Sequence, residues 1–243
     1  MKAALKKATA KTSDGPLTLA IDIGGSGIKS AVLGADHKPA SDFKRLPTPE
    51  PATPKAILDT IAELAAQEGA FDRIACGFPG VIKQGVIYTS ANLSPKCIGF
   101  HLAEGLQKKF GKPARVANDA TVQGYAAIEG KGLELTITLG TGVGAALFLN
   151  GKLAASLELA HHPFRGGKTY EEILGNKALL KLGKKHWNKR LQEAITNWSN
   201  LFRYDWLYIG GGNAEHIKFK LPANAKVKPN KDGIFGGVFL WQD

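Results

Sequence analysis

Two clusters of glycines, each directly after an apolar run, have the composition of loops that bind phosphate. The first reads Asp22-Ile23-Gly24-Gly25-Ser26-Gly27-Ile28-Lys29, and the second reads Gly140-Thr141-Gly142-Val143-Gly144. Glycine lets the backbone turn tightly and present its N–H groups to an anion. Asp22, just ahead of the first turn, is a carboxylate suited to a magnesium ion or to its waters. These residue types and spacings favour phosphate chemistry.

A dinucleotide-binding fingerprint also places glycines after a strand, but it must then open a helix. Here the apolar and β-branched run 28–33 follows the first cluster, and the run 145–149 follows the second. Both are typical of a returning strand, and Asn150-Gly151 behind the second is a strong hairpin signal. We therefore predict two strand–loop–strand hairpins, which together can grip a phosphate chain from two sides.

Asn118-Asp119 lies between the two clusters in the sequence, where a predicted strand, 114–117, meets a predicted helix, 120–129. Asn and Asp are both favoured at helix N-caps, so capping alone explains the pair. A position between two phosphate-type loops favours a functional role for Asp119 instead. The local sequence leaves both interpretations open.

The surrounding elements alternate between strand and helix patterns. Thr53 is a predicted N-cap for a helix that starts at Pro54 and places Ile57, Ile61 and Leu64 on one face. Further strands are predicted at 17–23, 73–77, 133–139 and 206–209, and further helices at 102–110 and around Trp187, Leu191, Ile195 and Trp198. This alternation, with an initial antiparallel hairpin, predicts an α/β fold.

The composition is that of a globular protein with room for two modest lobes. The chain has 243 residues, 44% of them apolar, and contains no apolar run near the roughly 18 residues of a membrane span. Cys76 and Cys97 are its only cysteines, so no disulfide framework is expected and a cytoplasmic location fits. Residues 1–15 are predicted to be a disordered basic tail.

The net charge of +11 is spread over both halves of the chain. Such an excess fits an anionic ligand, and it also fits a role in solubility alone. No helix-turn-helix, zinc finger or aromatic RNA-binding strand is visible, so we expect no nucleic-acid partner and no membrane partner.

The motifs 22–29, 118–119 and 139–144, followed by Glu158-Leu159-Ala160-His161, resemble in type and order those of the repressor–open reading frame–kinase (ROK) family of sugar kinases. The likeness runs from about Leu17 to Trp241. It implies an actin/hexokinase-like, ribonuclease H-like fold with two α/β lobes around a central cleft. The expected lobes are 16–117 and 118–233, with a closing helix at about 234–243 packed back on the first lobe.

The resemblance also implies roles for individual residues. Asp119 would be the general base that takes the proton of the sugar 6-hydroxyl, and Asp22 would face Mg²⁺. The sugar would contact Gly80, Asn92, Asn118, Asp119, Glu158, His161 and Glu171. The phosphates would contact Asp22, Gly24, Gly25, Ser26, Gly27, Lys29, Gly140, Thr141, Gly142 and Gly144. The loop Gly210, Gly211, Gly212 and Asn213 would lie near a nucleotide.

Two departures from the family pattern stand out. The segment 163–168 replaces the cysteine-rich zinc motif of most members, so no structural zinc is expected. This short, basic, zinc-free version resembles the branch of the family that uses inorganic polyphosphate. Ala160 also replaces the usual glycine. A basic donor track would draw on Lys29, Arg165, Lys168, Lys181, Lys184, Lys185, Lys189 and Arg190, although the last five also fit an ordinary solvated helix face.

The expected activity is phosphoryl transfer to the 6-hydroxyl of glucose by a homodimer, with polyphosphate, or polyphosphate and ATP, as the donor. The alternatives are a strictly ATP-dependent kinase of glucose or mannose, and a non-catalytic protein that binds sugar or polyphosphate. A sugar-responsive repressor would need a DNA-binding domain, and only about 16 residues precede the first predicted strand.

Overall fold

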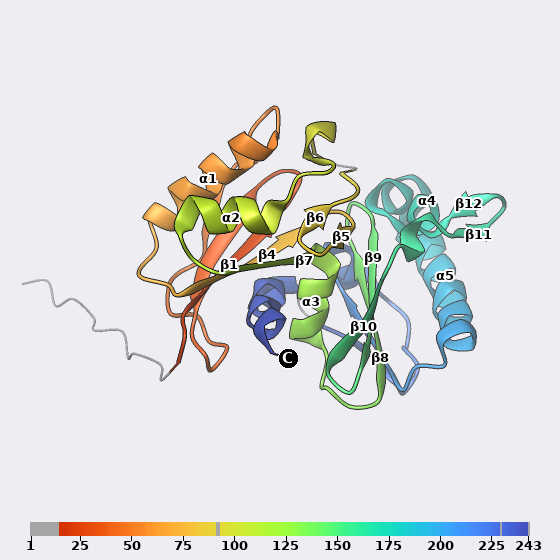
Figure 1. Cartoon of the computed structure of the whole chain (residues 1–243). Coiled ribbons are helices and arrows are strands. Elements are labelled where there is room, and N and C mark those ends of the chain that lie inside the picture. The colour runs from red at the N-terminus through yellow and green to blue at the C-terminus, as the bar shows by residue number, and fades with distance from the viewer. Residues whose placement is uncertain (1–14, 91–92, 229, 243) are drawn as a thin grey trace, which may run out of the picture.

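The computed structural model describes residues 15–90, 93–228 and 230–242. In this part of the chain two five-stranded sheets lie side by side, with helices on their faces (Figure 1). The predicted α/β fold is therefore confirmed. The predicted basic tail lies outside the described residues, apart from Gly15.

The first sheet has the strand order β3-β2-β1-β4-β7. Strands β1 and β2 form the predicted antiparallel hairpin around the first glycine cluster, and β4 and β7 run parallel to β1. A nucleotide fingerprint is thus excluded at this loop, because a strand and not a helix follows it. The bounds are β1 (Thr18–Ile23), β2 (Ile28–Leu33), β3 (Lys44–Leu46), β4 (Arg73–Phe78) and β7 (Ala114–Asn118).

The second sheet repeats this topology with the order β10-β9-β8-β13-β14. An antiparallel meander again precedes two parallel strands, so the second glycine cluster occupies the same place in its sheet as the first. No tandem repeat is evident in the sequence, because strand pairing requires a pattern of apolar residues and not particular ones. The bounds are β8 (Leu133–Leu139), β9 (Val143–Leu149), β10 (Lys152–Leu157), β13 (Trp206–Gly210) and β14 (Ala225–Val227).

Helices α1 (Pro54–Ala66) and α2 (Leu102–Phe110) cover one face of the first sheet (Figure 1). The N-cap of α1 is as predicted, since the Thr53 hydroxyl accepts a hydrogen bond from the Ala56 N–H. The predicted apolar face is buried against the sheet. The cap therefore determines where this helix starts, and the period of apolar residues determines which of its faces packs on the sheet.

The opposite face of the first sheet is covered by the C-terminal segment η4 (Asn230–Trp241). Ile234 and Val238 pack there against Ala20 and Leu33. The segment is a 3₁₀ helix that begins earlier than the helix predicted at about 234–243, and residue 243 lies outside the described part. Its glycines lower the propensity for an α-helix.

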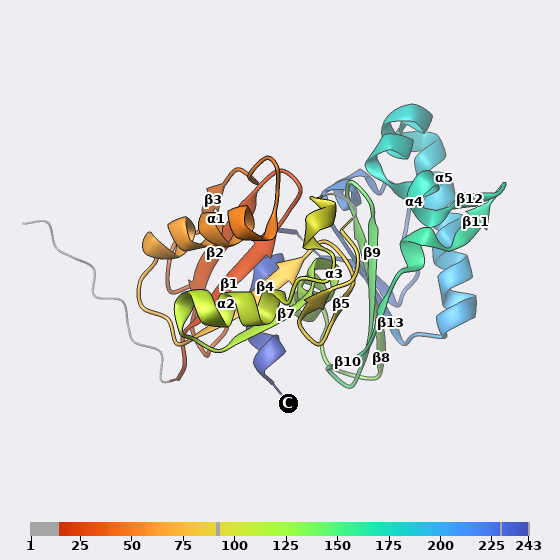
Figure 2. The ribbon, with the colours of Figure 1, turned by 45° about the horizontal axis from the view of Figure 1, so that its top comes forward.

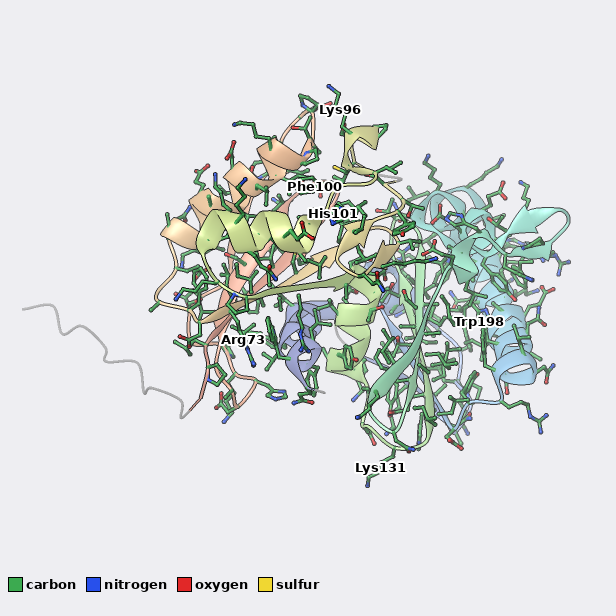
Figure 3. All side chains as sticks on the ribbon, viewed as in Figure 1. Arg73, Lys96, Phe100, His101, Lys131 and Trp198 are labelled. Carbon is green, nitrogen blue, oxygen red and sulfur yellow. The ribbon has the colours of Figure 1, made fainter. Side chains whose placement is uncertain are left out.

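Helix α5 (Asn176–Phe202) lies along the outer face of the second sheet, and α4 (Tyr170–Leu174) precedes it (Figure 2). The four large apolar residues predicted for its inner face, from Trp187 to Trp198, are all buried, and Trp198 extends from α5 toward the sheet (Figure 3). Across the described residues, every helix is too short or too polar to cross a lipid bilayer.

Helix α3 (Asp119–Ala127) contacts strands of both sheets and packs along η4. It begins one residue before the predicted start and ends two residues before the predicted end. The remaining elements are the hairpins β5 (Ile82–Lys83) with β6 (Val86–Ile87) and β11 (Pro163–Arg165) with β12 (Lys168–Thr169), and the 3₁₀ turns η1 (Pro95–Cys97), η2 (Leu159–His161) and η3 (Gly212–His216).

Candidate active site

A cleft of about 520 Å³ opens where the two sheets face each other, and residues of both sheets line it. Most residues that the sequence singled out converge there from segments far apart in the chain. They are Gly24, Gly25, Ser26, Lys29, Gly80, Asn118, Asp119, Gly140, Thr141, Gly142, Gly144, Glu158, His161, Glu171, Gly211 and Gly212.

Four predicted residues have other positions. Asp22 and Gly27 lie beside the cleft and do not line it, and Gly210 lines a separate cavity of about 60 Å³. Asn213 is buried, and its Nδ2 donates to the Gly140 carbonyl at 3.0 Å. This hydrogen bond links η3 to the second glycine loop. Asn92 lies outside the described residues.

The two glycine loops close with a backbone hydrogen bond at their bases. The Gly24 N–H donates to the Gly27 carbonyl at 3.0 Å, and the Gly140 N–H donates to the Gly142 carbonyl at 3.0 Å. The second loop is also fixed to α5, because the Asn176 N–H donates to the Gly140 carbonyl at 2.9 Å. Both loops are therefore held rigidly against the cleft, which lowers the entropy cost of binding an anion.

Asn118 caps α3 and also lines the cleft. Its Oδ1 accepts hydrogen bonds from the Ala120 N–H at 2.9 Å and the Thr121 N–H at 3.3 Å. Its Nδ2 donates to the Gly80 carbonyl at 3.1 Å. The capping interpretation is thus confirmed, and the amide keeps one N–H that these contacts do not use.

Asp119 is the first residue of α3 and projects toward the cleft. Burial, with the negative charges of Asp22 and Glu158, raises its pKa to about 7, even though the Ala120 N–H donates to its Oδ1 at 2.8 Å. A carboxylate with an ordinary pKa near 4 is a weak base. The environment therefore gives Asp119 a pKa suited to a general base at neutral pH.

We expect the pH profile of turnover to report this pKa. If Asp119 accepts a proton, only its ionised form is active, so kcat/KM should fall about tenfold per pH unit below a midpoint near 7 and level off above it. Initial rates across pH 5 to 9 (roughly) in buffers of constant ionic strength measure the profile. A midpoint near pH 4 would exclude the carboxyl in its observed environment as the base.

Asp22 lies opposite Lys29 in the β1–β2 hairpin, and the Lys29 Nζ is 3.6 Å from its Oδ2. Burial raises the pKa of Asp22, and the charge of Lys29 offsets part of that effect. The described residues contain no group of three or more acidic, histidine or cysteine side chains placed to enclose a metal ion. Mg²⁺ commonly binds through one or two carboxylates with phosphates and waters, and Asp22 fits that mode.

Glu158 directly precedes η2 and His161 is its last residue, and both line one wall of the cleft, with the His161 Nε2 3.6 Å from Glu158 Oε2. The adjacent residues Glu171 and Glu172 make different contacts. Glu171 lines the cleft, and its carboxylate occupies the space that a side chain at Gly142 would fill. Glu172 forms a capping box with Thr169. This geometry favours Glu171 over Glu172 as a ligand-binding group.

The basic residues proposed for a donor track are dispersed. Lys29 lines the cleft, whereas Arg165 and Arg190 both pair with Glu193 on the outer side of α5. Lys168 and the four α5 lysines predicted for the track, Lys181, Lys184, Lys185 and Lys189, are absent from the walls of the cleft. Their positions match the solvated helix face.

Sequence reasoning missed several residues of the cleft, among them Thr89, Gln123 and Thr138. Gln123 follows Asp119 by one helical turn, and that spacing places both on one face of α3. Thr138 lies two residues before the second glycine cluster. Thr89 has no local signal, because the fold of the loop after β6 alone brings it to the cleft.

Comparisons with known proteins agree with this geometry. The ROK family model matches residues 18–160. The chain is 30% identical over 248 residues to a polyphosphate glucokinase of Mycobacterium leprae, covering 95% of this chain and 76% of the relative. It is 33% identical over 202 residues to the polyphosphate glucokinase of Mycobacterium tuberculosis H37Rv, covering 79% and 76%.

Solved structures show the same fold. The inorganic polyphosphate/ATP-glucomannokinase of Arthrobacter sp. strain KM superposes with a TM-score of 0.82 at 29% identity, over 93% of this chain and 98% of that one. A ROK family glucokinase from Streptomyces griseus, in complex with glucose and AMPPNP, superposes with a TM-score of 0.73 at 19% identity, over 92% and 98%. The actin/hexokinase-like fold is thus confirmed, and the chain belongs to the ROK family of sugar kinases.

Proposed function

We propose that this protein is a glucokinase that transfers a phosphoryl group from inorganic polyphosphate to the 6-hydroxyl of glucose. One observation carries the proposal: Asp119, a carboxylate with a pKa near 7, projects into a cleft between two glycine loops. The relatives named polyphosphate glucokinase support the choice of substrates. A non-catalytic binding protein would have no use for a tuned base.

In the proposed reaction the glucose 6-hydroxyl lies within hydrogen-bonding reach of Asp119. As the oxygen attacks the terminal phosphorus, its proton passes to the carboxylate, the P–O bond to the rest of the donor breaks, and the shortened polyphosphate leaves. The hydroxyl therefore becomes a phosphate ester without forming a free alkoxide.

The sugar is held by groups that pair with hydroxyls. We assign this role to Asn118, through its remaining N–H, and to Gly80, Asn92, Glu158, His161 and Glu171. A ring of such groups rejects ligands that would leave one of them buried without a partner. The exposed side chains of Glu158 and His161 fit a site that becomes covered only when sugar binds.

The donor phosphates are assigned to the two glycine loops and Lys29. A magnesium ion held by Asp22 and by phosphate oxygens would neutralise charge that develops on the transferred group. We further propose that the lobes 16–117 and 118–233 close on the substrates. Formation of a homodimer and a cytoplasmic location stay predictions.

The donor assay tests the function directly. With glucose and Mg²⁺, we expect glucose 6-phosphate to form with polyphosphate as the sole donor, measured by a coupled dehydrogenase reaction. Because a polyanion is held largely by charge, its KM should rise more steeply with added salt than the KM for ATP. Absence of product with either donor would contradict the kinase assignment.

A second candidate function is ATP-dependent phosphorylation of glucose and mannose. Two observations favour it: the Arthrobacter relative is named for both donors and both sugars, and Gly211 and Gly212 line the cleft. Parallel assays with ATP and with mannose separate this activity from strict polyphosphate dependence.

A further inference from the structure

A row of charged residues crosses the first sheet beside the first glycine loop. Asp22 on β1 lies opposite Lys29 on β2, and Lys29 in turn lies opposite Arg45 on β3. Residues directly opposite in neighbouring strands extend from the same face of the sheet. On its other side Asp22 lies opposite Gly77 of β4, and Gly77 packs against the backbone of Asp119. The row therefore begins next to Asp119 and runs outward to Arg45.

The outer half of this row is electrostatically unfavourable in the free protein. Like charges directly opposite one another destabilise a strand pair, and Lys29 and Arg45 are such a pair. Asp22 compensates Lys29 at 3.6 Å. Within the described residues Arg45 takes part in no ion pair, and its side chain is exposed. The guanidinium charge of Arg45 is therefore available to pair with an anion from outside the chain.

Arg45 is nevertheless held in a defined place. Its Nη2 donates to the Ser26 carbonyl at 2.9 Å, and its guanidinium lies over Gly27 so closely that a Cβ there would come within 2.4 Å of it. This contact explains why residue 27 is a glycine, although it does not line the cleft. A glycine at this position lets the guanidinium pack on the first glycine loop while keeping N–H groups that the Ser26 hydrogen bond does not use.

We propose that Arg45 binds the donor at phosphates beyond the one that is transferred, and so sets the preference for a linear polyphosphate. This inference rests on the proposed function of the cleft. Neighbouring strands lie about 4.8 Å apart, so the backbone of Arg45 is about 10 Å from that of Asp22 along the row. A single phosphate near Asp119 does not span that distance, whereas a phosphate chain does. The planar guanidinium also matches phosphate oxygens in a bidentate manner.

The Arg45→Gln variant tests the proposal through the kinetics of the donor. We expect the KM for a long-chain polyphosphate to rise about tenfold, with kcat and the KM for glucose unchanged. The KM for tripolyphosphate and for ATP should change less, because neither presents a long phosphate chain at that position. The Arg45→Lys variant keeps the charge and should recover part of the loss.

Two further variants separate the role of Arg45 from a general effect. Gly27→Ala should also raise the KM for polyphosphate, because the new methyl group displaces the guanidinium without removing its charge. Lys131→Gln removes one exposed charge at the far end of the second sheet (Figure 3) and should leave the donor KM unchanged.

The outcomes are distinct. If Arg45→Gln lowers kcat and the affinity for glucose for all donors alike, or leaves the KM for polyphosphate unchanged, Arg45 only stabilises the loop and the inference is wrong. If the unmodified protein forms no product from any donor, the proposed function fails, and calorimetric titration with polyphosphate still decides the role of Arg45. Equal binding by the unmodified protein and by Arg45→Gln would then contradict it.

Discussion

Asp119→Asn should lower kcat about 10³-fold while leaving the affinity for glucose nearly unchanged. The amide keeps the size of the side chain and can still accept the hydrogen bond from the Ala120 N–H, but it cannot take the proton of the 6-hydroxyl. The coupled assay measures kcat, and calorimetric titration with glucose measures binding. Asp36→Asn, in an exposed turn, is the matched control and should behave as the unmodified protein.

The same substitution should stabilise the fold at alkaline pH. The folded-state pKa of Asp119 is about 7, above the ordinary value near 4, so ionisation of this carboxyl opposes folding. Its contribution to stability is most favourable below the ordinary pKa and is lost as the pH rises through 7. The variant lacks this loss, so at pH 8 its free energy of unfolding should be higher by up to about 4 kcal/mol.

Chemical denaturation at pH 8 and pH 5 measures this difference, which should shrink at the lower pH. An Asp119→Asn variant that turned over at a substantial rate would exclude Asp119 as the base. A variant less stable than the unmodified protein at pH 8 would show that the surroundings of Asp119 do not disfavour its ionised form. The combination of lost activity and gained stability is the signature of a site tuned for function at the expense of the fold.

Gly236→Ala should destabilise the protein by about 3 kcal/mol, because overpacking of this kind forces the backbone to move. Gly236 lies in η4 against α3, and a Cβ there would overlap the Val122 carbonyl and crowd the Ala126 backbone nitrogen. The contact cannot relax by rotating a side chain. It can relax only if η4 moves away from the helix that carries Asp119, which exposes Ile234 and Val238.

Thermal unfolding should show a decrease in Tm of about 8 °C for this variant, together with a lower kcat. Gly69→Ala is the control, since its added Cβ meets no atom within 4 Å, and its effect should stay within about 1 kcal/mol. An unchanged Tm for Gly236→Ala would mean that the close packing of η4 on α3 does not exist in solution.

Local features were predictable from the sequence because they depend on local physics. The Thr53 cap, the buried face of α1 and the hairpins around both glycine clusters follow from hydrogen-bonding side chains, from the period of apolar residues and from turn chemistry. The C-terminal helix was less well predicted, because packing against α3 and the glycines that permit it override a simple helical pattern.

The sequence by itself determined the α/β class, the two phosphate-type loops and the position of Asn118-Asp119 between them. Only the tertiary structure decided what these residues can do. The pKa of Asp119 depends on burial and on the charges of Asp22 and Glu158. Glu171 lines the cleft beside Gly142, whereas Glu172 forms a capping box with Thr169. Arg45 acquires its place from strand register. Desolvation and charge–charge energies depend on distances in space, and residues remote in the chain set those distances.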